Sequence, residues 1–290
     1  MNLVPHWMSK RLALLLGLCF FQSCLSHADS EQRRLSTITW NVWFDQKTGG
    51  ERYPNILREL KAHSPEIIFL QEVTPAFIKL ANQQLRGSSF YFTPSKDARR
   101  RYGQAFITNT PLLMLKEYSL DSQYGRDAVI GAYPLKDDHA LILINVHLES
   151  GLFESKMRAH QVDQITNVFE KEFREVLKAE YPELTTLSVV WAGDFNLGYS
   201  EFSEGIGGFV DSAKVFSDNT PTYHVDNNYL ANATAGWFED SARLDRVLVR
   251  SDTLTPTSYE VKNNEYYAQY SDHYPVVVEL SVSQPITANK

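Results

Sequence analysis

Short apolar runs recur between residues 35 and 282 and divide the chain into expected strands and helices. Eight runs rich in Val, Ile and aromatic residues predict β-strands. They cover residues 36–42, 66–70, 103–108, 129–134, 141–147, 187–192, 244–250 and 274–282. Turn-forming residues dominate residues 198–236, for which long polar loops are expected.

Apolar residues three or four positions apart predict helices between these strands. The longest of them is expected at residues 154–179. The apolar stripes consist of Ile56, Leu57 and Leu60 in the first helix, Phe77, Leu80, Ala81 and Leu85 in the second, and Val162, Ile165, Phe169, Phe173 and Val176 in the longest. Strands and helices alternate early and strands dominate late, which indicates an α/β fold with a mixed sheet arrangement.

Composition and spacing indicate one globular domain. Of the 290 residues, 43% are hydrophobic and 22% are charged, which excludes a disordered or fibrous protein. No repeat or Gly/Ser/Pro linker interrupts the pattern, and two packed sheets would fill a core of this size. The two cysteines, Cys19 and Cys24, both lie in the N-terminal apolar stretch, which excludes a disulfide framework and a zinc site with Cys ligands.

The first 28 residues have the three parts of a secretory signal peptide. Lys10 and Arg11 precede an apolar run at residues 12–21, and a small-x-small sequence ends at Ala28. The run is too short to span a membrane. We therefore expect an exported protein, periplasmic or secreted, with residues 1–28 as signal and 29–290 as the mature domain. Lipoprotein anchoring at Cys24 is the alternative, although Phe21 stands where an aliphatic residue is usual.

The charge of the mature domain limits how it can bind a polyanion. The formal net charge of −7 becomes −9 from residue 29 onward, because residues 1–28 contain two basic residues and no acid. An acidic body does not hold nucleic acid or phospholipid through its overall charge, so such binding must be local. Arg99, Arg100 and Arg101 form the one concentrated basic run, which would suit a nucleic-acid backbone or a solvated loop equally well.

Several apolar runs end in polar side chains of the kinds that active sites use. Asn41, Glu72 and His147 follow three of the predicted strands, and Asp194-Phe195-Asn196 follows a fourth. Strands that end in such groups place them at one sheet edge, where sites are commonly built. Carboxylates, amides and imidazoles without cysteine suit a hard, oxygen-liganded ion such as Mg²⁺, with Mn²⁺ as a substitute.

Six motifs in order resemble those of the endonuclease/exonuclease/phosphatase superfamily. They are Thr39-Trp40-Asn41, Gln71-Glu72, His147-Leu148-Glu149-Ser150, Gly193-Asp194-Phe195-Asn196-Leu197, Leu244-Asp245-Arg246 and Ser271-Asp272-His273. The His-Leu-Glu-Ser element is most similar to the 5′-tyrosyl-DNA phosphodiesterase branch, whereas residues 271–276 are equally similar to secreted sphingomyelinases and nucleases. The resemblance implies a DNase I-like, two-sheet α/β sandwich with helices on the outer faces and one active site at the strand ends.

The resemblance also implies the roles of individual residues. Glu72 would hold Mg²⁺, with Asn41 beside it and Asp272 near the metal. Asp194 would orient or deprotonate the attacking water, helped by the Asn196 amide.

The remaining roles concern the phosphate. His273 would contact the scissile phosphate, and Asp245 would fix its tautomer and favour its charged form. His147 would donate to a phosphate oxygen, and Ser150 is expected among the substrate-binding residues together with the three arginines. Such a site hydrolyses a phosphodiester by direct attack of water and needs no Ser or Cys nucleophile.

The sequence constrains the choice of substrate less than it constrains the fold and the reaction. The tyrosyl-DNA branch usually carries an Arg shortly after its Gly-Asp-x-Asn-Leu motif, where this chain has Gly198-Tyr199. We therefore expect a monomeric, exported Mg²⁺-dependent phosphodiesterase acting on nucleic acid or nucleotide derivatives, with no stable membrane span. The alternatives are a sphingomyelinase-like phospholipid headgroup hydrolase and a non-catalytic binding module. Tyr223 and Tyr229, or Trp237-Phe238, would form the membrane-facing loop of the former.

Overall fold

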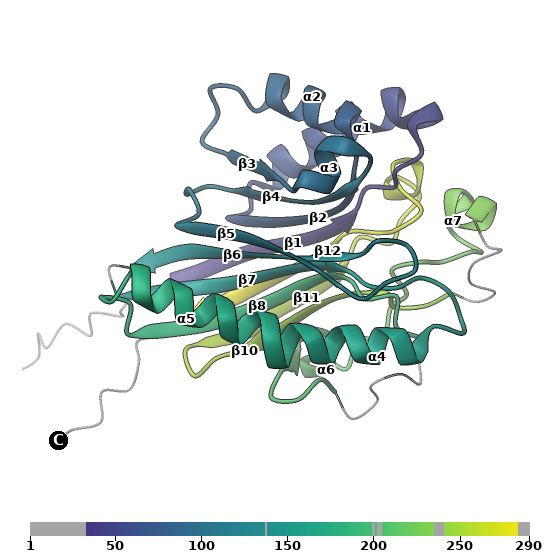
Figure 1. The fold of residues 1–290 in the computed structure, drawn as a ribbon. Coiled ribbons are helices and arrows are strands. Elements are labelled where there is room, and N and C mark those ends of the chain that lie inside the picture. The colour runs from purple at the N-terminus through teal and green to yellow at the C-terminus, as the bar shows by residue number, and fades with distance from the viewer. Residues whose placement is uncertain (1–32, 137, 199–200, 202–204, 235–240, 284–290) are drawn as a thin grey trace, which may run out of the picture. The chain divides into compact units, whose positions relative to one another are not determined.

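The computed structural model describes residues 33–283 except 137, 199–200, 202–204 and 235–240 (Figure 1). The predicted signal peptide, Cys24, Tyr199 and the Trp237-Phe238 pair lie outside the described residues. Among the described residues, no helix combines the length and the apolar composition needed to cross a bilayer.

Two six-stranded mixed sheets form the centre of the domain, as the sequence predicted. The first sheet has the strand order β11 (Leu254–Val261), β12 (Val276–Val282), β1 (Arg33–Asn41), β2 (Ile67–Val73), β4 (Gly103–Thr108), β3 (Tyr91–Pro94). The second has the order β5 (Met114–Ser119), β6 (Asp127–Lys136), β7 (His139–His147), β8 (Thr186–Asp194), β10 (Asp245–Arg250), β9 (Val210–Asp211). The main core lies between the sheets, where Leu35, Phe69 and Phe106 of the first share one apolar cluster with Leu143 and Val190 of the second.

Each sheet contains one parallel pair, and a helical crossover joins its two strands. Helix α1 (Gln46–His63) joins β1 to β2. The run of α4 (Ser155–Asp163), a π-helical segment (Gln164–Phe169) and α5 (Glu170–Glu180) joins β7 to β8. In Figure 1 the two crossovers lie on opposite outer sides of the paired sheets. The carboxyl ends of β1, β2, β7 and β8 are therefore brought to one edge of the sandwich.

The other helices are short. Helix α2 (Pro75–Gln84) begins at Thr74, whose side chain accepts a hydrogen bond from the Phe77 amide. Helix α3 (Lys96–Arg100) contains Arg99 and Arg100 of the predicted basic run, and Arg101 follows it. The expected loop region 198–236 contains α6 (Ser212–Val215) and α7 (Tyr229–Thr234). A 3₁₀ turn, Tyr267–Gln269, precedes β12.

The longest predicted helix is interrupted by the π turn. Ile165 and Phe173 of its stripe are fully buried, but Leu177 rather than Val176 packs in the core. Leu177 follows Phe173 by four positions within α5, a spacing that keeps two residues on one face of an α-helix as well as the predicted spacing of three does.

Candidate active site

Strand register places the predicted site residues opposite one another. Asn41 ends β1 beside Gln71 of β2, and His147 ends β7 directly beside Asp194, the last residue of β8. Antiparallel β10 begins at Asp245, which is also paired with Asp194. The ends of both sheets thus meet around Asp194.

Glu72 reaches this site through a local break in the sheet. The pairing of β2 with β4 is irregular between Leu70 and Val73, and Glu72 has a positive φ of 58°. Its Oε2 accepts a hydrogen bond from the Phe44 amide at 2.8 Å and its Oε1 accepts one from Asn41 Nδ2 at 3.2 Å. A bulge of this kind re-aims a side chain, here toward the neighbouring sheet.

Asn145 fills the gap that the bulge leaves. Its side chain extends from β7 in the second sheet and donates to the backbone carbonyls of Leu70 and Ala105 in the first, at 3.1 and 3.0 Å. Gln71 in turn donates to Asn145 Oδ1 at 2.8 Å. These fully buried amides fix the relative positions of the two sheets directly beneath the site.

Gly193 lets the strand ends approach. It has a φ of 139°, and a Cβ added there would lie 2.1 Å from the carbonyl oxygen of Val146. Only glycine fits this position, which explains the Gly before Asp194 in physical terms.

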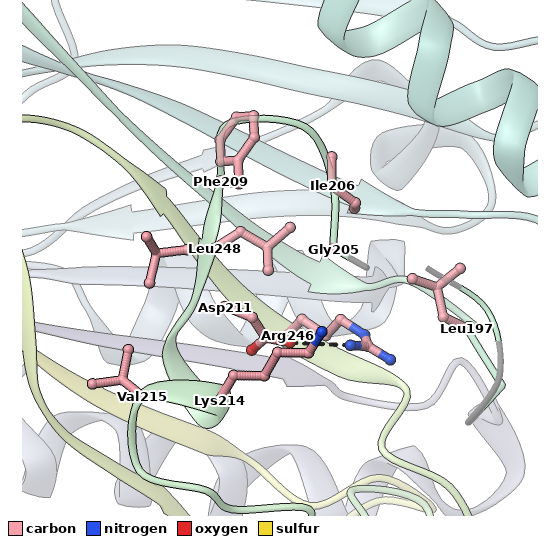
Figure 2. A pocket seen from close by; sticks show the side chains of 10 residues that line it. Leu197, Gly205, Ile206, Phe209, Asp211, Lys214, Val215, Arg246 and Leu248 are labelled. Carbon is pink, nitrogen blue, oxygen red and sulfur yellow. Dashed lines mark hydrogen bonds and ion pairs between the residues drawn. The ribbon is translucent and has the colours of Figure 1, made fainter. Parts of the chain in front are cut away.

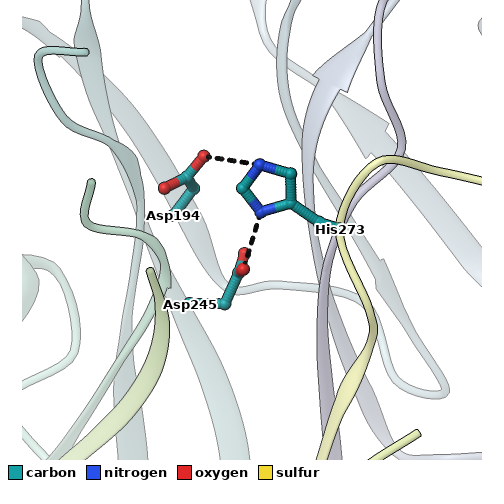
Figure 3. Close-up of side chains that lie close together, drawn as sticks. All are labelled: Asp194, Asp245 and His273. Carbon is teal, nitrogen blue, oxygen red and sulfur yellow. Dashed lines mark hydrogen bonds and ion pairs between the residues drawn. The ribbon is translucent and has the colours of Figure 1, made fainter. Parts of the chain in front are cut away.

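Asp194 and Asp245 flank the imidazole of His273 (Figure 3). Asp245 Oδ2 lies 2.7 Å from His273 Nδ1, and Asp194 Oδ2 lies 3.7 Å from His273 Nε2. Burial works against a charged imidazole, but Asp245 and Asp194 outweigh it and hold the pKa of His273 well above its ordinary value. His273 is therefore an imidazolium at neutral pH, with its Nε2–H directed toward Asp194.

Asp194 itself is held as an anion. Burial alone would raise its pKa, but His147, His273 and hydrogen bonds from the Asn41 amide and the Asn196 backbone lower that pKa below its ordinary value. The Asn196 backbone N–H donates to Asp194 Oδ1 at 2.9 Å. The Asn196 side chain is used elsewhere, because its Nδ2 donates to the Leu148 carbonyl at 3.0 Å.

His147 is neutral, and its tautomer is set by Arg126. Arg126 Nη1 lies 3.0 Å from His147 Nδ1, and a guanidinium can only donate, so Nδ1 carries no proton. Burial and the Arg126 charge together lower the pKa of His147 well below its ordinary value. The remaining Nε2–H lies 3.4 Å from Asp194 Oδ2. His147 can thus donate one hydrogen bond into the site without carrying a charge.

Glu72 and Asp272 are the carboxylates best suited to hold a metal ion. Both are buried, and burial together with the proximity of Asp272 raises the pKa of Glu72 to about 7. Burial likewise raises the pKa of Asp272. A bound cation would stabilise the ionised forms of both, and their oxygens are the ligands that Mg²⁺ and Mn²⁺ prefer.

Asp194, Asp245 and His273 also lie close enough together for one ligand atom of each to reach a common ion. Asp245 engages His273 Nδ1 at 2.7 Å, so only Nε2 of this ring is left to face an ion. We interpret this group as a proton-holding triad, and Glu72 and Asp272 as the candidate metal ligands.

Asn41 donates hydrogen bonds both to Glu72, a candidate metal ligand, and to Asp194 of the triad. Its Nδ2 donates to Glu72 Oε1 at 3.2 Å and to Asp194 Oδ2 at 3.0 Å, while its Oδ1 accepts from the Trp43 amide at 3.0 Å. In this orientation Asn41 positions two carboxylates. Direct ligation of a metal by Oδ1 would require the amide to turn over.

A pocket of about 280 Å³ opens over these groups. Its polar floor contains Glu72, His147, Asp194, Asn196 and Asp272. Aromatic residues form the walls, namely Trp43, Phe44, Tyr102, Tyr124 and Tyr223. Phe44 stacks on Tyr102 with ring centroids 4.9 Å apart and is still 46% exposed. The floor suits a phosphate and the walls suit a planar group attached to it.

The predicted substrate-binding residues divide into two groups. Ser150 lines the pocket and accepts a hydrogen bond from Arg126 Nη2 at 2.5 Å. Arg99, Arg100 and Arg101 lie on or next to α3 and do not line it. Arg101 donates to Asp97 at 3.1 Å and to the Gly125 carbonyl at 3.1 Å, which holds the loop next to Arg126.

Sequence reasoning missed Arg126, Tyr102 and Tyr124. Arg126 stands immediately before β6, and the predicted strand began three residues later, at 129. The available signal was the short connection between the predicted strands 129–134 and 141–147, which favours a hairpin. Antiparallel pairing places residues before the first strand beside those after the second. His147 and Arg126 meet in this way.

Comparisons with known proteins agree with this geometry. A family model described as "Endonuclease/Exonuclease/phosphatase family" matches residues 38–273. Tyrosyl-DNA phosphodiesterase 2 of Danio rerio is 25% identical over 245 residues, which cover 79% of this chain and 60% of the relative. The Xenopus tropicalis protein of that name is 24% identical over 193 residues, 63% of this chain and 46% of the relative. The chain thus spans about half to three fifths of these relatives.

Solved structures share the fold. D. rerio TDP2 complexed with single strand DNA product superposes with a TM-score of 0.69 at 23% identity, covering 87% of this chain and all of that one. A Bacteroides thetaiotaomicron mannosyl-6-phosphatase gives a TM-score of 0.61 at 20% identity, covering 85% and 99%. The predicted two-sheet fold is confirmed. The chain belongs to the Endonuclease/Exonuclease/phosphatase family, which agrees with the enzyme class predicted from its motifs, a metal-dependent phosphoric diester hydrolase.

Proposed function

We propose that this protein is an exported, Mg²⁺-dependent phosphodiesterase that cleaves nucleic acid or nucleotide derivatives by direct attack of water. The observation that carries the proposal is the setting of Asp194, an anion placed between the N–H groups of His147 and His273 at 3.4 and 3.7 Å. A carboxylate in this position can hold a water molecule and accept its proton. The imidazole N–H groups on either side can bind the oxygens of a phosphate.

His273 and His147 have different roles because their protonation states differ. His273, held charged by Asp245, stabilises negative charge on the phosphate, and neutral His147 donates from Nε2. Arg126 keeps His147 in that tautomer. Glu72 and Asp272 would hold Mg²⁺ or Mn²⁺, which when bound neutralises charge on the phosphate oxygens.

The pocket supports a substrate with a planar group next to the phosphate. Phe44, Tyr102 and Tyr124 lie on the walls, beside the Arg126 guanidinium. Bases of a single strand or an aromatic leaving group would stack there. The names of the relatives, Tyrosyl-DNA phosphodiesterase 2, support a nucleic-acid substrate, and the −9 charge of the mature domain leaves recognition to these local contacts.

One observation favours a phospholipid substrate as the second candidate. Phe153 is 94% exposed and Leu152 is 49% exposed, in the loop that follows the pocket residue Ser150. Buried Arg158 fixes this loop by donating to the carbonyls of Glu149 and Gly151 at 3.0 and 2.7 Å. Exposed apolar side chains beside an active site could enter the interface of a lipid surface.

A substrate panel tests the proposal. The purified protein is incubated with single-stranded DNA, duplex DNA, a 5′-tyrosyl oligonucleotide, sphingomyelin vesicles and mannose 6-phosphate, each with Mg²⁺ and with EDTA. We expect EDTA-sensitive cleavage of a nucleic-acid substrate. Asp194→Ala should fold normally and lose at least about 10³-fold in kcat, as for other positioned catalytic groups. Asp252→Ala, at an exposed position, is the matched control.

Each outcome decides between the candidates. Cleavage of sphingomyelin alone would replace the nucleic-acid proposal with the headgroup hydrolase, and cleavage of the sugar phosphate alone would replace it with a monoesterase. Near-native kcat for Asp194→Ala would refute the mechanism. A folded, metal-binding protein inactive on every substrate would favour the binding module.

Export is a separate part of the proposal. It is supported by the cationic start, the apolar run at residues 12–21 and the cleavage sequence ending at Ala28. N-terminal sequencing of the protein recovered outside the cytoplasm should begin at Asp29. A mature N-terminus at Cys24 would indicate lipoprotein processing, and a cytoplasmic protein that retains Lys10 would contradict export.

A further inference from the structure

A second pocket, of about 320 Å³, lies beside β10 on the outer face of the second sheet (Figure 2). Most of the side chains around it are apolar, including Ile206, Phe209, Val215 and Leu248. The polar side chains are Asp211, Lys214 and Arg246. None of these residues belongs to the candidate active site.

Strand alternation explains why a charged residue faces this pocket. Successive side chains of β10 point to opposite faces of the sheet. Val247 and Val249 pack in the core between the sheets, whereas Leu248 packs on the outer face. Arg246 therefore points away from the active site, although it directly follows Asp245.

Positive charge exceeds negative charge around the pocket. Asp211 is paired with both nitrogens of the Arg243 fork, at 3.1 and 2.7 Å. Arg246 Nη1 shares the same carboxylate at 3.1 Å, so two guanidinium groups share one acid. Among the described residues, Asp211 is the one acid that pairs with Arg246, and burial and the charge of Arg243 lower the pKa of Arg246 to about 10.

Arg246 also has an unused hydrogen-bond donor. The residue is only 8% exposed, and its Nε is buried without a partner among the described residues. A buried donor without an acceptor costs free energy, about 1 to 3 kcal/mol and more for a charged group. In Figure 2 the guanidinium lies between Asp211 and Leu197. Because the side chain lines the pocket, an anion bound there would supply the missing negative charge.

Apolar residues at the pocket are exposed to an unusual degree. Val210 is 51% exposed and Val215 is 48% exposed, and Phe216 next to them is 41% exposed. An apolar rim around a buried cationic group matches an amphipathic ligand, whose charged end enters first. The volume is at the lower limit for small-molecule pockets, which restricts the ligand to a compact molecule.

We propose that this pocket binds a small organic anion, with its carboxylate or phosphate on Arg246 and its apolar group against Phe209, Val215 and Leu248. The shared chemistry is a single anionic head on a short apolar body. The site is distinct from the phosphodiesterase centre, and its occupancy does not depend on the function proposed above.

Calorimetric titration of the full chain tests the proposal with defined probes: octanoate, octyl phosphate, inorganic phosphate and 1-octanol. We expect saturable binding of at least one of the two octyl anions, with inorganic phosphate and octanol at least tenfold weaker. Arg246→Met, which keeps an unbranched apolar stem and removes the guanidinium, should weaken binding of the octyl anion at least tenfold, because a hydrogen bond to a charged group is lost. Arg99→Met, on exposed α3, is the control and should bind as the unmodified protein does.

A second variant keeps the proposal testable if Arg246→Met does not fold. Lys214 is exposed at the pocket, so Lys214→Glu should leave the fold unchanged and weaken the octyl anion by reversing a charge. Binding of only one of the two anions, octanoate or octyl phosphate, would identify the head group that the pocket accepts. Absence of binding by both, equal binding of octanol, or full affinity in both Arg246→Met and Lys214→Glu would overturn the proposal.

Discussion

The Asn41 amide donates to Asp194 Oδ2 at 3.0 Å, which links the end of β1 in one sheet to the end of β8 in the other. The same Nδ2 reaches Glu72 at 3.2 Å. One side chain therefore sets the spacing between the carboxylate expected to bind metal and the carboxylate expected to bind water.

Replacing Asn41 with Ala should reduce kcat by about 10- to 100-fold, since hydrogen bonds to charged groups contribute about 1.5 to 3 kcal/mol. Steady-state kinetics on the cleaved substrate of the panel measure the effect. Asn263→Ala, at an exposed position, is the control. An unchanged kcat for Asn41→Ala would mean that other contacts set the spacing.

Glu72→Gln should raise the Mg²⁺ concentration that activity requires. A neutral amide attracts a divalent cation less than a carboxylate does, so the Mg²⁺ concentration for half-maximal activity should rise at least tenfold. Titration of activity and of bound metal with Mg²⁺ gives both readouts. Glu265→Gln is the exposed control. The same Mg²⁺ titration in Glu72→Gln and the unmodified protein would place the metal elsewhere.

Asp245→Asn should move the alkaline limit of activity to lower pH. The raised pKa of His273 keeps the imidazolium present below that pKa, and activity is expected to fall as pH rises through it. Without the Asp245 charge the pKa of His273 drops, so deprotonation begins at a lower pH. The pH profile of kcat/KM shows the shift. Identical alkaline limbs would show that His273 does not act as a charged group.

Gly193→Ala should destabilise the fold by about 3 kcal/mol or more, because the backbone is in a region disfavoured for alanine and the added Cβ would collide with the Val146 carbonyl. Urea unfolding measures the loss. Gly50→Ala is the matched control, since a Cβ at Gly50 meets nothing within 4 Å and the residue lies in helix α1. Equal stability of the two variants would contradict the close approach of β7 and β8.

The eight predicted strands all occur, and the four strands that the sequence did not predict are the four sheet edges, β3, β5, β9 and β11. The difference has a physical cause. Central strands are buried on both faces and appear as apolar runs, whereas β5 is half-buried along most of its length and β11 contains Pro256. Edge strands carry polar residues and Pro, so their sequences resemble loops.

The site residues that follow apolar runs could be predicted from the sequence. Asn41, Glu72, His147 and Asp194 lie at or near strand ends, and register alone brings them together. Arg126 was not predictable from its own surroundings, because its role depends on reaching His147 across the hairpin. The positive φ of Glu72 and the Asn145 contacts between the sheets depend on tertiary packing and leave no local pattern.

The strand order also determines when the site becomes complete during synthesis. The first sheet pairs Arg33 of β1 with Val282 of β12, so its centre is built from opposite ends of the described chain. At a synthesis rate of about 5 to 20 residues per second, β1 waits roughly 10 to 50 s for this partner. His273 is made only just before β12 and is held by Trp40, whose indole donates to its carbonyl at 3.0 Å. A growing chain therefore carries Asn41, Glu72 and Asp194 long before it carries the imidazole of His273, and the site is complete only after β12 has been made.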